Sequence, residues 1–549
     1  MTNRILYSSG RIVFIQLILV IGFCALLGRL IYLQIYQDIF LDDQVFSRLD
    51  SQYSLLAPRG KILDRNDRVL AMDVKGYSVG IDLKKFIYQK DTVILLSEVL
   101  DKNPSDLTSV LINKSSGFIE IRRNINYETK EKLKNKKIPG IYFRENLRRS
   151  YPERNISSHV VGLTDIDRKG IQGVELVFHN ELQGEIGSFT GIKGSKNTKL
   201  EGNRVEATPG KDIKLTIDLN IQSIAYHELD KKIKETNAEA GSIVVVEPSS
   251  GNILGLVNYP SFDPTDRRNL DDMGRLRNRA TIDVFEPGSV MKPLAMSAII
   301  ESEKIDISEK VDTSPGWIEF EGFKTSDFRD YGILNLSKII SLSSNVGMVK
   351  LCENQDLRHL INFYKKFGIG RFPTSIMIPA REGFLPHESS FTLRDKVSSC
   401  YGYGMTLSAL QIAQAYSVFA NEGNFVELNL FEDHSFGEDY KERVIKTETN
   451  KIIVDMLVET VNSIGGTASK ARLKDYIVAG KTGTAKETLD EETTYTSTFA
   501  GFVPAQEPEF LAVIVLHGLS GEDYSGGRVS APLFSDIMKQ VLLLKDLKI

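Results

Sequence analysis

The feature that most constrains this chain is an uncharged apolar run over residues 12–27, close to the N-terminus. Gly28 and Arg29 follow it, and then comes the apolar segment LIYLQIY. Because an arginine can extend its guanidinium toward the lipid–water interface, Arg29 does not end the usable span, which reaches about 20 residues and is long enough to cross a bilayer. Arg4 and Arg11 precede the run, so the short N-terminal end is expected to stay in the cytoplasm.

A cleaved signal peptide is the alternative interpretation of this run. No small-residue cleavage site follows it, and the run is longer than the apolar core of a typical signal peptide. A lipoprotein signal at Cys24 is disfavoured because the bulky Phe23 precedes that cysteine. We therefore expect a cytoplasmic tail over residues 1–11, one transmembrane anchor over residues 12–36, and about 510 residues outside the cytoplasm.

The composition of the 549 residues is that of a globular protein, with 42% hydrophobic and 26% charged residues. A formal net charge of -4 argues against a protein that coats nucleic acid, which needs a basic face. The three cysteines, Cys24, Cys352 and Cys400, are too few for a disulfide framework, and whether Cys352 pairs with Cys400 stays open. No CxxC or HExxH spacing indicates a zinc site.

The chain between the anchor and residue 211 is expected to form a domain of its own. Residues 37–56 have a polar, helical pattern, and apolar pairs on either side of Arg65-Asn66-Asp67 predict a β-hairpin. Residues 184–211 are rich in Gly, Lys and Ser, which predicts loops or an arm between domains.

Residues 212–549 are expected to form a single larger domain. A strand runs into an amphipathic helix at the start of this region, and GSIVVVEPSSGNILGLVN has the turn chemistry of a hairpin. YIVAGKTGTA, STFAGFVPA and FLAVIVLHG read as further strands, and APLFSDIMKQVLLLK reads as a closing amphipathic helix. The pattern predicts an α/β domain with an antiparallel sheet flanked by helices.

The first chemical motif in this region is Ser289-Val290-Met291-Lys292, which follows Glu286-Pro287-Gly288 and begins a predicted helix. Ser289 and Lys292 lie one turn apart and share a face, near the positive end of the helix dipole. A serine hydroxyl needs an adjacent base to act as a nucleophile, and a lysine serves if its amine is neutral. A serine cap with a solvated lysine is the ordinary alternative.

Two further motifs follow along the chain. Ser343-Ser344-Asn345 is expected at or between helices, where Ser343 can relay a proton and Asn345 can bind a peptide amide. Residues 481–484, Lys-Thr-Gly-Thr, follow an apolar strand, and the glycine is expected to let a ligand backbone lie close. A helix junction and a turn after a strand are the ordinary alternatives. The three motifs together, in this order, match the signature of penicillin-binding proteins and class A β-lactamases.

The chain resembles a class B penicillin-binding protein of the septal, cell-division transpeptidase (FtsI) type. The segments that carry the resemblance are RGKILDRN, RRSYP, GIQGVE, VFEPGSVMKP, SLSSNVGMVKL, YGYGMTLSALQIAQAY and AGKTGTAK. Asn345 favours the division type, because elongation-type relatives generally carry Asp at this position. Val290 and Cys400 depart from the usual Thr and Ser, and the segment around Trp317 has no confident match.

The resemblance implies a fold class and a location. The fold class is α/β, with a single N-terminal transmembrane helix, an elongated α+β pedestal over residues 37–211, and a transpeptidase domain over residues 212–549. That last domain is of the penicillin-binding, serine β-lactamase-like kind. The protein is expected in a bacterial inner membrane, with the catalytic domain outside the cytoplasm and at the division septum.

The resemblance also implies acyl transfer through a serine. Ser289 attacks the carbonyl between the last two D-alanines of a stem peptide, and Lys292 accepts its proton. Ser343 passes the proton to the leaving D-alanine, and Asn345 holds the peptide amide. The backbone N–H groups of Ser289 and Thr484 form the oxyanion hole.

The remaining expectations concern substrate binding and partners. Lys481 sets the charge of the site, and Thr482 and Thr484 hold the terminal carboxylate beside Gly483. β-Lactams acylate the same serine, and no metal or organic cofactor has a role. A polymerase of the SEDS (FtsW) type and other division proteins are the implied partners in the membrane.

Rival functions stay open. A D,D-carboxypeptidase and an elongation-type class B transpeptidase share these motifs. A β-lactamase would be soluble and would lack the long N-terminal region. A membrane β-lactam sensor or a division scaffold is the non-enzyme alternative; the complete set of Ser289, Lys292, Ser343 and Lys481 argues against an inactive scaffold. No polymerase-like acidic box is found in residues 37–210, which disfavours a bifunctional enzyme.

Overall fold

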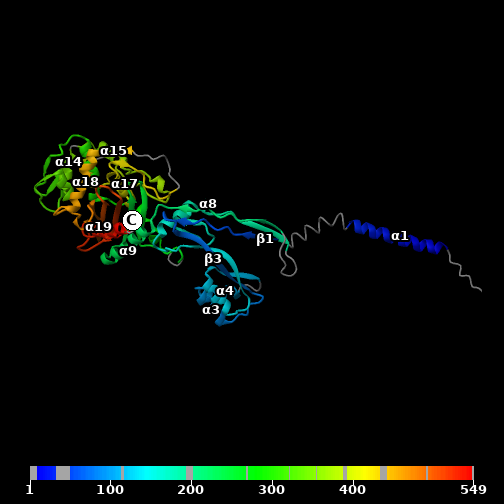
Figure 1. Ribbon diagram of the computed structural model, residues 1–549. Coiled ribbons are helices and arrows are strands. Elements are labelled where there is room, and N and C mark those ends of the chain that lie inside the picture. The colour runs from blue at the N-terminus through cyan, green and yellow to red at the C-terminus, as the bar shows by residue number, and fades with distance from the viewer. Residues whose placement is uncertain are drawn as a thin grey trace, which may run out of the picture. The chain divides into compact units, whose positions relative to one another are not determined.

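The computed structural model describes residues 9–32, 50–112, 117–192, 202–266, 270–320, 322–353, 355–387, 392–432, 442–489 and 492–546 (Figure 1). The chain divides into two compact units, one of residues 1–58 with 183–210 and one of residues 59–182 with 211–549. The pedestal and catalytic boundaries given by the sequence stay predictions.

The smaller unit contains the apolar N-terminal helix and a three-stranded sheet. Helix α1 (Ser9–Ile31) includes the span Ile12–Ile31, which is long and apolar enough to cross a membrane. Of the predicted anchor, residues 33–36 lie outside the described residues. The sheet has the order β1-β8-β9, from β1 (Asp50–Leu55), β8 (Gly187–Ile192) and β9 (Gly202–Val205), all antiparallel.

One local prediction is wrong in this unit. The helix expected over residues 37–56 is a strand at Asp50–Leu55, and residues 37–49 lie outside the described residues. Residues 184–211, expected as loops or an arm between domains, include strands β8 and β9, so the loop alternative does not hold there. Strand β1 pairs with β8, which is more than a hundred residues away in sequence, so a local pattern could not reveal the partner that stabilises it.

The first part of the larger unit, residues 59–182, is a sheet with small helices. The strands of this sheet are β2 (Ile62–Leu63), β3 (Val69–Asp82), β4 (Phe118–Ile125) and β5 (Ile141–Ser150), and a separate pair is formed by β6 (Leu163–Thr164) and β7 (Gly170–Gln172). Its helices are α3 (Lys90–Val99), α4 (Pro104–Ile112), α5 (Tyr127–Asn135), α6 (Ser158–Val161), α7 (Gly173–Val177) and α8 (His179–Leu182). The predicted hairpin is confirmed, because β2 pairs antiparallel with β3 across a turn that the Asp64 carboxylate stabilises by accepting from the N–H groups of Asn66 and Arg68.

The second part begins with β10 (Ile213–Lys214), which adds to β2 in parallel, and contains the largest sheet of the protein. The strands of that sheet have the order β12-β11-β21-β20-β19 and are all antiparallel. They are β11 (Ala240–Glu247), β12 (Asn252–Tyr259), β19 (Ala479–Leu489), β20 (Glu492–Val503) and β21 (Phe510–Leu519). The predicted hairpin and strands of this region are therefore confirmed.

The helices of this part are α9 (Leu219–Thr236), α10 (Met273–Leu276), α11 (Arg279–Ile282), α12 (Lys292–Glu301), α13 (Leu336–Ser341), α14 (Asn345–Glu353), α15 (Leu357–Lys366), α16 (Leu393–Ser399), α17 (Ala409–Ala420), α18 (Thr447–Asn462) and α19 (Ser530–Asp546). The 3-10 turns are η3 (Gly288–Met291), η4 (Thr374–Ile376) and η5 (Ser469–Ala471). The small strand pairs are β13 (Lys310–Asp312) with β16 (Ile333–Asn335), β14 (Trp317–Phe320) with β15 (Phe323–Ser326), and β17 (Asn424–Phe425) with β18 (Glu442–Arg443).

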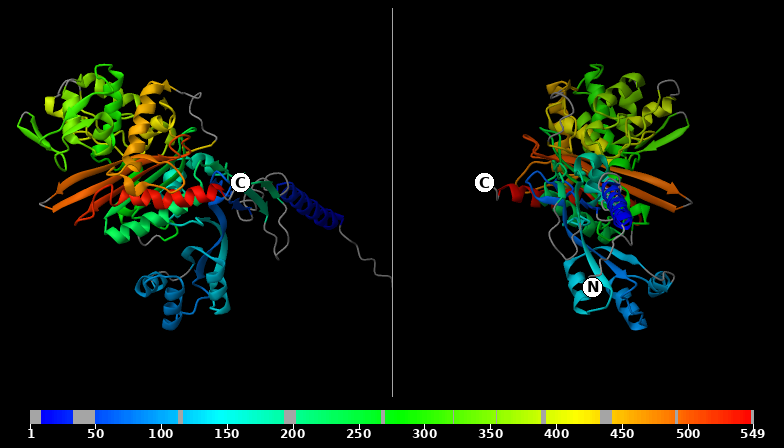
Figure 2. Two further views of the ribbon diagram at one scale, coloured as in Figure 1. Left: turned by 60° about the vertical axis from the view of Figure 1, so that its left-hand side comes forward. Right: turned by 90° about the vertical axis from the view of Figure 1, so that its right-hand side faces the viewer.

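Both faces of the large sheet are buried. Along β11, Val244 and Val246 belong to one hydrophobic cluster, and Ile243 and Val245 belong to another on the opposite face. Helices α9 and α19 cover the second face, whereas α12 and α17 contribute to the first (Figure 2). This layering confirms the predicted α/β fold class, with an antiparallel sheet flanked by helices.

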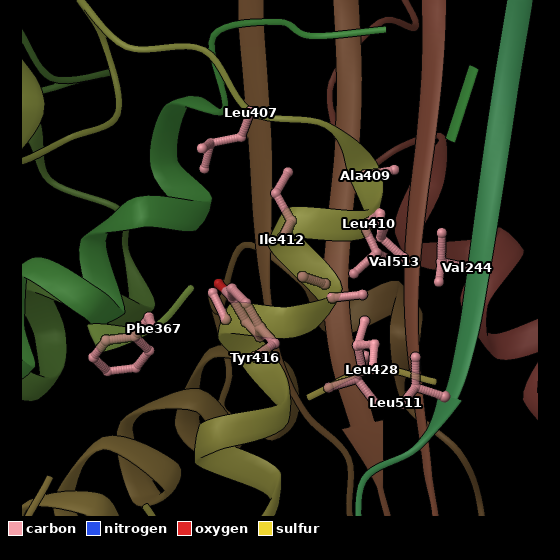
Figure 3. Close-up of a cluster of buried hydrophobic side chains, with 14 of the residues drawn as sticks. Val244, Phe367, Leu407, Ala409, Leu410, Ile412, Tyr416, Leu428, Leu511 and Val513 are labelled. Carbon is pink, nitrogen blue, oxygen red and sulfur yellow. The ribbon is translucent and has the colours of Figure 1, made fainter. Parts of the chain in front are cut away.

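Helix α17 links the sheet to the turn that carries Ser289. A capping box of Ser408 and Gln411 begins the helix, and Figure 3 shows Leu410 close to Val513 of β21 within the buried cluster. One side chain of the helix, Tyr416, donates its hydroxyl to the carbonyl oxygen of Val290 at 2.8 Å. The rigid core therefore holds the backbone next to Ser289.

Candidate active site

Ser289 lies on the 3-10 turn η3, which leads directly into α12. Gly288 has a φ of 59°, which glycine adopts without steric cost, and donates its N–H to Gly402 O at 3.0 Å. A Cβ on Gly288 would lie 3.2 Å from Thr484 O, so this glycine also allows β19 to approach. The helix start predicted at or near Ser289 is confirmed, and its α-helical part begins at Lys292.

The four residues predicted to act with Ser289 form one hydrogen-bonded cluster. Lys292 is fully buried, and its Nζ donates to Ser343 O at 2.6 Å and to Asn345 Oδ1 at 2.7 Å, with Ser343 Oγ at 3.2 Å. Lys481 is also fully buried and donates from Nζ to Ser343 Oγ at 2.9 Å. Three segments far apart in the sequence thus converge on Ser343.

Burial controls the protonation of the two lysines. It lowers the pKa of Lys292 to about 7, although the charge of Asp327 acts in the opposite direction. Burial also lowers the pKa of Lys481 well below its ordinary value, and the charge of Lys292 lowers it further. Two ammonium groups beside one hydroxyl repel each other, so the two amines are not both in the ammonium form near neutral pH. A neutral amine is therefore available in the site.

Ser343 lies in the predicted place, between α13 and α14. Its φ is 60°, a left-handed conformation that costs a residue other than glycine on the order of 1 kcal/mol and persists where the surroundings hold it. The Ser343 and Ser344 N–H groups donate to the carbonyl oxygens of Ile340 and Ile339 at the end of α13. This sharp turn directs the backbone carbonyl of Ser343 to Lys292.

The residues Lys481 to Thr484 lie on strand β19, as predicted, and pair with β20. The structure gives Gly483 a packing role, because its missing Cβ would lie 2.9 Å from Pro287 O and 3.1 Å from Val290 Cγ1; the role predicted for it in ligand approach stays a prediction. The glycine therefore allows β19 to pack against the turn that carries Ser289. The close contact between this strand and this turn is enough to require a glycine at position 483.

The two threonines of this strand are held by separate partners. Thr482 donates from Oγ1 to Thr467 Oγ1 at 3.2 Å, and Thr484 Oγ1 accepts from Gly526 N at 3.1 Å. Tyr403 donates its hydroxyl to Thr484 O at 3.3 Å. Both threonines thus have fixed positions beside the lysine cluster.

One expected contact is absent. Between the described residues Ser289 and Lys292, no hydrogen bond joins Ser289 Oγ to Lys292 Nζ; the amine binds Ser343 and Asn345 instead. Catalytic hydrogen bonds are often long before substrate binds and tighten in the complex.

A cavity of about 680 Å³ opens beside Asn345. Its lining comes from the segment before Ser289, strand β15, helix α16 and the loop that follows it: Glu286, Phe323, Lys324, Thr325, Ser326, Asn345, Thr392, Arg394, Asp395, Ser398, Tyr401, Tyr403 and Gly404. Gly404 donates its N–H to Glu286 Oε1 at 3.0 Å, so a carboxylate faces the cavity three residues before Ser289. The cavity has room for a peptide segment beside the cluster.

Sequence reasoning missed several residues of this site. Glu286 and Tyr403 fall within segments that carried the resemblance, but their types and spacing gave no role. Thr467 and Asp327 lie in segments without a recognisable motif, and only the folded chain brings them to the site.

The two cysteines left open by the sequence form a disulfide. Cys352, on α14, is bonded to Cys400, which directly follows α16. Beside this bond, the small cluster of Val349, Val397 and Tyr401 packs the same two segments together. The disulfide therefore joins the helix that begins at the Ser343 turn to the loop that lines the cavity.

Comparison with known proteins agrees with this geometry. The family model "Penicillin binding protein transpeptidase domain" matches residues 241–539, and "Penicillin-binding Protein dimerisation domain" matches residues 54–215. A solved structure described as a peptidoglycan synthetase from Bifidobacterium adolescentis has the same fold, with a TM-score of 0.70 and 24% identity over 90% of this chain and 97% of that chain.

Curated relatives match over nearly the whole chain. "Peptidoglycan D,D-transpeptidase FtsI" of Escherichia coli is 31% identical and covers 94% of this chain and 89% of the relative. "Probable peptidoglycan D,D-transpeptidase PbpC" of Pseudomonas aeruginosa is 31% identical, over 96% and 94%. "Probable peptidoglycan D,D-transpeptidase PenA" of Neisseria gonorrhoeae is 32% identical, over 97% and 92%. The chain belongs to the class B penicillin-binding proteins and is a serine-type peptidoglycan D,D-transpeptidase.

Proposed function

We propose that this protein cross-links peptidoglycan stem peptides during septal wall synthesis, through an acyl-enzyme on Ser289. The observation that carries the proposal is the lysine cluster. The buried amines of Lys292 and Lys481 both lie within hydrogen-bonding distance of the Ser343 hydroxyl, and the Asn345 amide oxygen binds Lys292. A buried site that gives up a proton near neutral pH can activate a serine hydroxyl.

In the first half-reaction, Ser289 Oγ turns toward Lys292 Nζ and attacks the carbonyl carbon of the donor peptide's penultimate D-alanine. Lys292 takes the serine proton, and the backbone N–H groups of Ser289 and Thr484 hold the developing oxyanion. The C–N bond to the terminal D-alanine then breaks. Ser343 passes a proton to the leaving amine, and Lys481 holds the Ser343 hydroxyl in position.

In the second half-reaction, an amine of a neighbouring stem peptide attacks the acyl-serine. A new amide bond forms, the ester to Ser289 breaks, and the serine recovers its proton. Asn345 holds the donor peptide's amide; before the terminal D-alanine leaves in the first half-reaction, Thr482 and Thr484, beside Gly483, bind its carboxylate. Hydrolysis of the same ester would make the protein a carboxypeptidase, so the product decides between the two.

The location follows from three observations. Arg4 and Arg11 precede α1, which favours a cytoplasmic N-terminus and an extracytoplasmic catalytic domain. The Cys352–Cys400 disulfide supports that orientation, because such bonds persist in oxidising compartments. The relative named FtsI and the Asn at position 345 support a septal role over an elongation role.

The acyl-enzyme is tested by labelling membranes with a fluorescent penicillin. The parent protein is expected to carry one label at Ser289, identified by mass spectrometry of the peptide. Ser289→Ala is expected to lose the label and keep its thermal unfolding temperature. Ser302→Ala, at the far end of α12, is the matched control and keeps the label. A label that persists in folded Ser289→Ala would refute the assignment.

The septal partner is a SEDS-type (FtsW) glycan polymerase, which residues 1–210 dock without a catalytic role of their own. Gly22, Ala25 and Gly28 are spaced by three along α1, and small residues so spaced allow close helix contact in lipid. Replacing residues 1–36 with an unrelated anchor of the same orientation should preserve penicillin labelling and reduce co-purification with the polymerase. Normal co-purification and normal division in the exchanged protein would show that the anchor is only a tether.

A further inference from the structure

The turn that carries Ser343 and Asn345 receives its helix cap from a distant carboxylate. Asp327 Oδ1 accepts from the N–H groups of Asn345 and Val346, and the Val346 distance is 3.0 Å. Asp327 Oδ2 accepts from Ser344 Oγ at 2.6 Å. The first N–H groups of a helix have no partner within it, so one side chain here satisfies the orphan donors that begin α14.

The bonding continues into the helix itself. Ser344 Oγ accepts from Gly347 N at 2.9 Å, which makes Ser344 the local cap of α14. Asp327 thus orients the capping hydroxyl as well as the two backbone donors. A carboxylate at this end of a helix also gains from the helix dipole.

A small hairpin holds Asp327 in place. The residue directly follows β15, which pairs with β14, and its own N–H donates to Gly316 O at 2.9 Å. The preceding residue, Ser326, accepts from Asn345 Nδ2 at 3.0 Å. Asn345 is therefore held at its backbone by Asp327 and at its side chain by Ser326, which leaves its Oδ1 directed to Lys292.

Asp327 is also the negative charge that acts on the lysine cluster. Its charge raises the pKa of Lys292, against the effect of burial. Strand β19 brings the opposing positive charge of Lys481. Helix α18 packs on α12, and its Glu459 is already paired with Lys338 at 2.6 Å. The cavity wall adds Glu286, which is bound to Gly404.

We propose that Asp327 is a positioning residue of the acyl transfer, which fixes the Ser343–Asn345 turn and supplies the counter-charge of the lysine cluster. This inference rests on the proposed function, in which Lys292 is the base. It gives a role to the segment around Trp317 and Asp327 that the sequence left without one.

The test compares acylation rates by a fluorescent penicillin between about pH 5.5 and pH 9 in the full-length, membrane-anchored protein. Asp327→Asn removes the charge and one acceptor, and we expect acylation about 10- to 100-fold slower, the loss typical of a misplaced catalytic group. In this variant a negative charge no longer stabilises the ammonium form of Lys292. The acid limb of the pH–rate profile, where acylation falls as the amine is protonated, should therefore move to lower pH. Ser344→Ala keeps the charge and should slow acylation without moving the acid limb.

The matched control is Asp330→Asn, in the same segment, whose Oδ1 accepts from Gly332 N at 2.8 Å. This control should behave as the parent. An Asp327→Asn rate within about twofold of the parent, or a slower rate with an unmoved acid limb, would overturn the proposal. If Asp327→Asn does not fold, Asp327→Ser, which keeps a capping hydroxyl without charge, is subject to the same two criteria. Failure of the parent to label at Ser289 would instead refute the proposed function.

Discussion

Two clusters of buried charge within the larger unit are stabilised in opposite ways. In residues 59–182, Arg59 and Arg149 each contact Glu175 at 2.6 Å, and these three side chains are nearly inaccessible to solvent. In the catalytic cluster, Lys292 and Lys481 are fully buried, and no carboxylate of the described residues forms an ion pair with either.

The difference shows how one fold separates support from reactivity. An arginine does not lose its proton in a protein, so its burial requires a fixed opposite charge such as Glu175. A lysine can lose its proton, so burial without an ion pair lowers its pKa, as at Lys292. A permanent cation in the unpaired cluster should therefore reduce activity, whereas loss of the carboxylate from the paired cluster should reduce stability.

The largest effect is expected from Lys292→Arg, which puts a permanent cation into the unpaired cluster. Without a neutral amine the serine has no base, and we expect penicillin acylation to fall about 10²- to 10⁴-fold. The measurement is the second-order acylation rate with a fluorescent penicillin. Lys350→Arg, on the outer part of α14, is the matched control and should acylate at the parent rate. Acylation of Lys292→Arg at close to the parent rate would mean that another group is the base.

Removing the counter-charge of the paired cluster should instead destabilise the fold. Glu175→Gln removes the carboxylate that Arg59 and Arg149 share and leaves Arg149 only the Asp73 carboxylate, at 3.6 Å. Breaking this buried cluster is expected to cost about 3–5 kcal/mol of unfolding free energy. Urea unfolding measures the change. As a control, Glu145→Gln, at an exposed position on β5, should leave the unfolding free energy nearly unchanged. The prediction is wrong if Glu175→Gln unfolds at the parent urea concentration, or if the folded variant has an altered acylation rate.

The residues of the lysine cluster could be predicted because each of its motifs is encoded locally. Ser289 and Lys292 are one turn apart, and Lys481 follows an apolar strand, so each motif could be read in its own segment. The large sheet was predictable for the same reason, since β11 and β12 form a hairpin with recognisable turn residues.

The parts that the sequence missed depend on contacts between distant segments. Strand β1 is stabilised by β8, and Asp327 caps a helix that begins 18 residues later. The packing of Gly483 against Pro287 was likewise not predicted. In each case the partner is fixed by the tertiary fold, which overrides local propensity.

The Cys352–Cys400 disulfide adds a third kind of support beside the catalytic cluster. It closes a loop of 48 residues, and the double change Cys352→Ser with Cys400→Ser should reduce the unfolding free energy by about 2–4 kcal/mol. Urea unfolding of the anchored protein, with and without a reductant, measures this. Cys24→Ser, in α1, is the control and should leave the unfolding free energy unchanged, because Cys24 is a free cysteine. An unchanged midpoint in the double variant would show that the small cluster of Val349 and Val397 holds the segments without the bond.

The smallest expected effect is the pH dependence of the parent enzyme, and it tests the comparison most directly. Burial lowers the pKa of Lys292 to about 7 in the folded protein, and only the neutral amine accepts the proton of Ser289. Acylation should therefore rise with pH through about 7 and level off above it. The neutral fraction at about pH 6 is roughly a tenth of that at about pH 8, so the rate should differ about tenfold. Folded Glu175→Gln should have the same midpoint, because the paired cluster holds no base for Ser289. A parent profile that is flat between these pH values, or one with its midpoint near the ordinary lysine pKa, would show that Lys292 is not the unpaired base that the comparison requires.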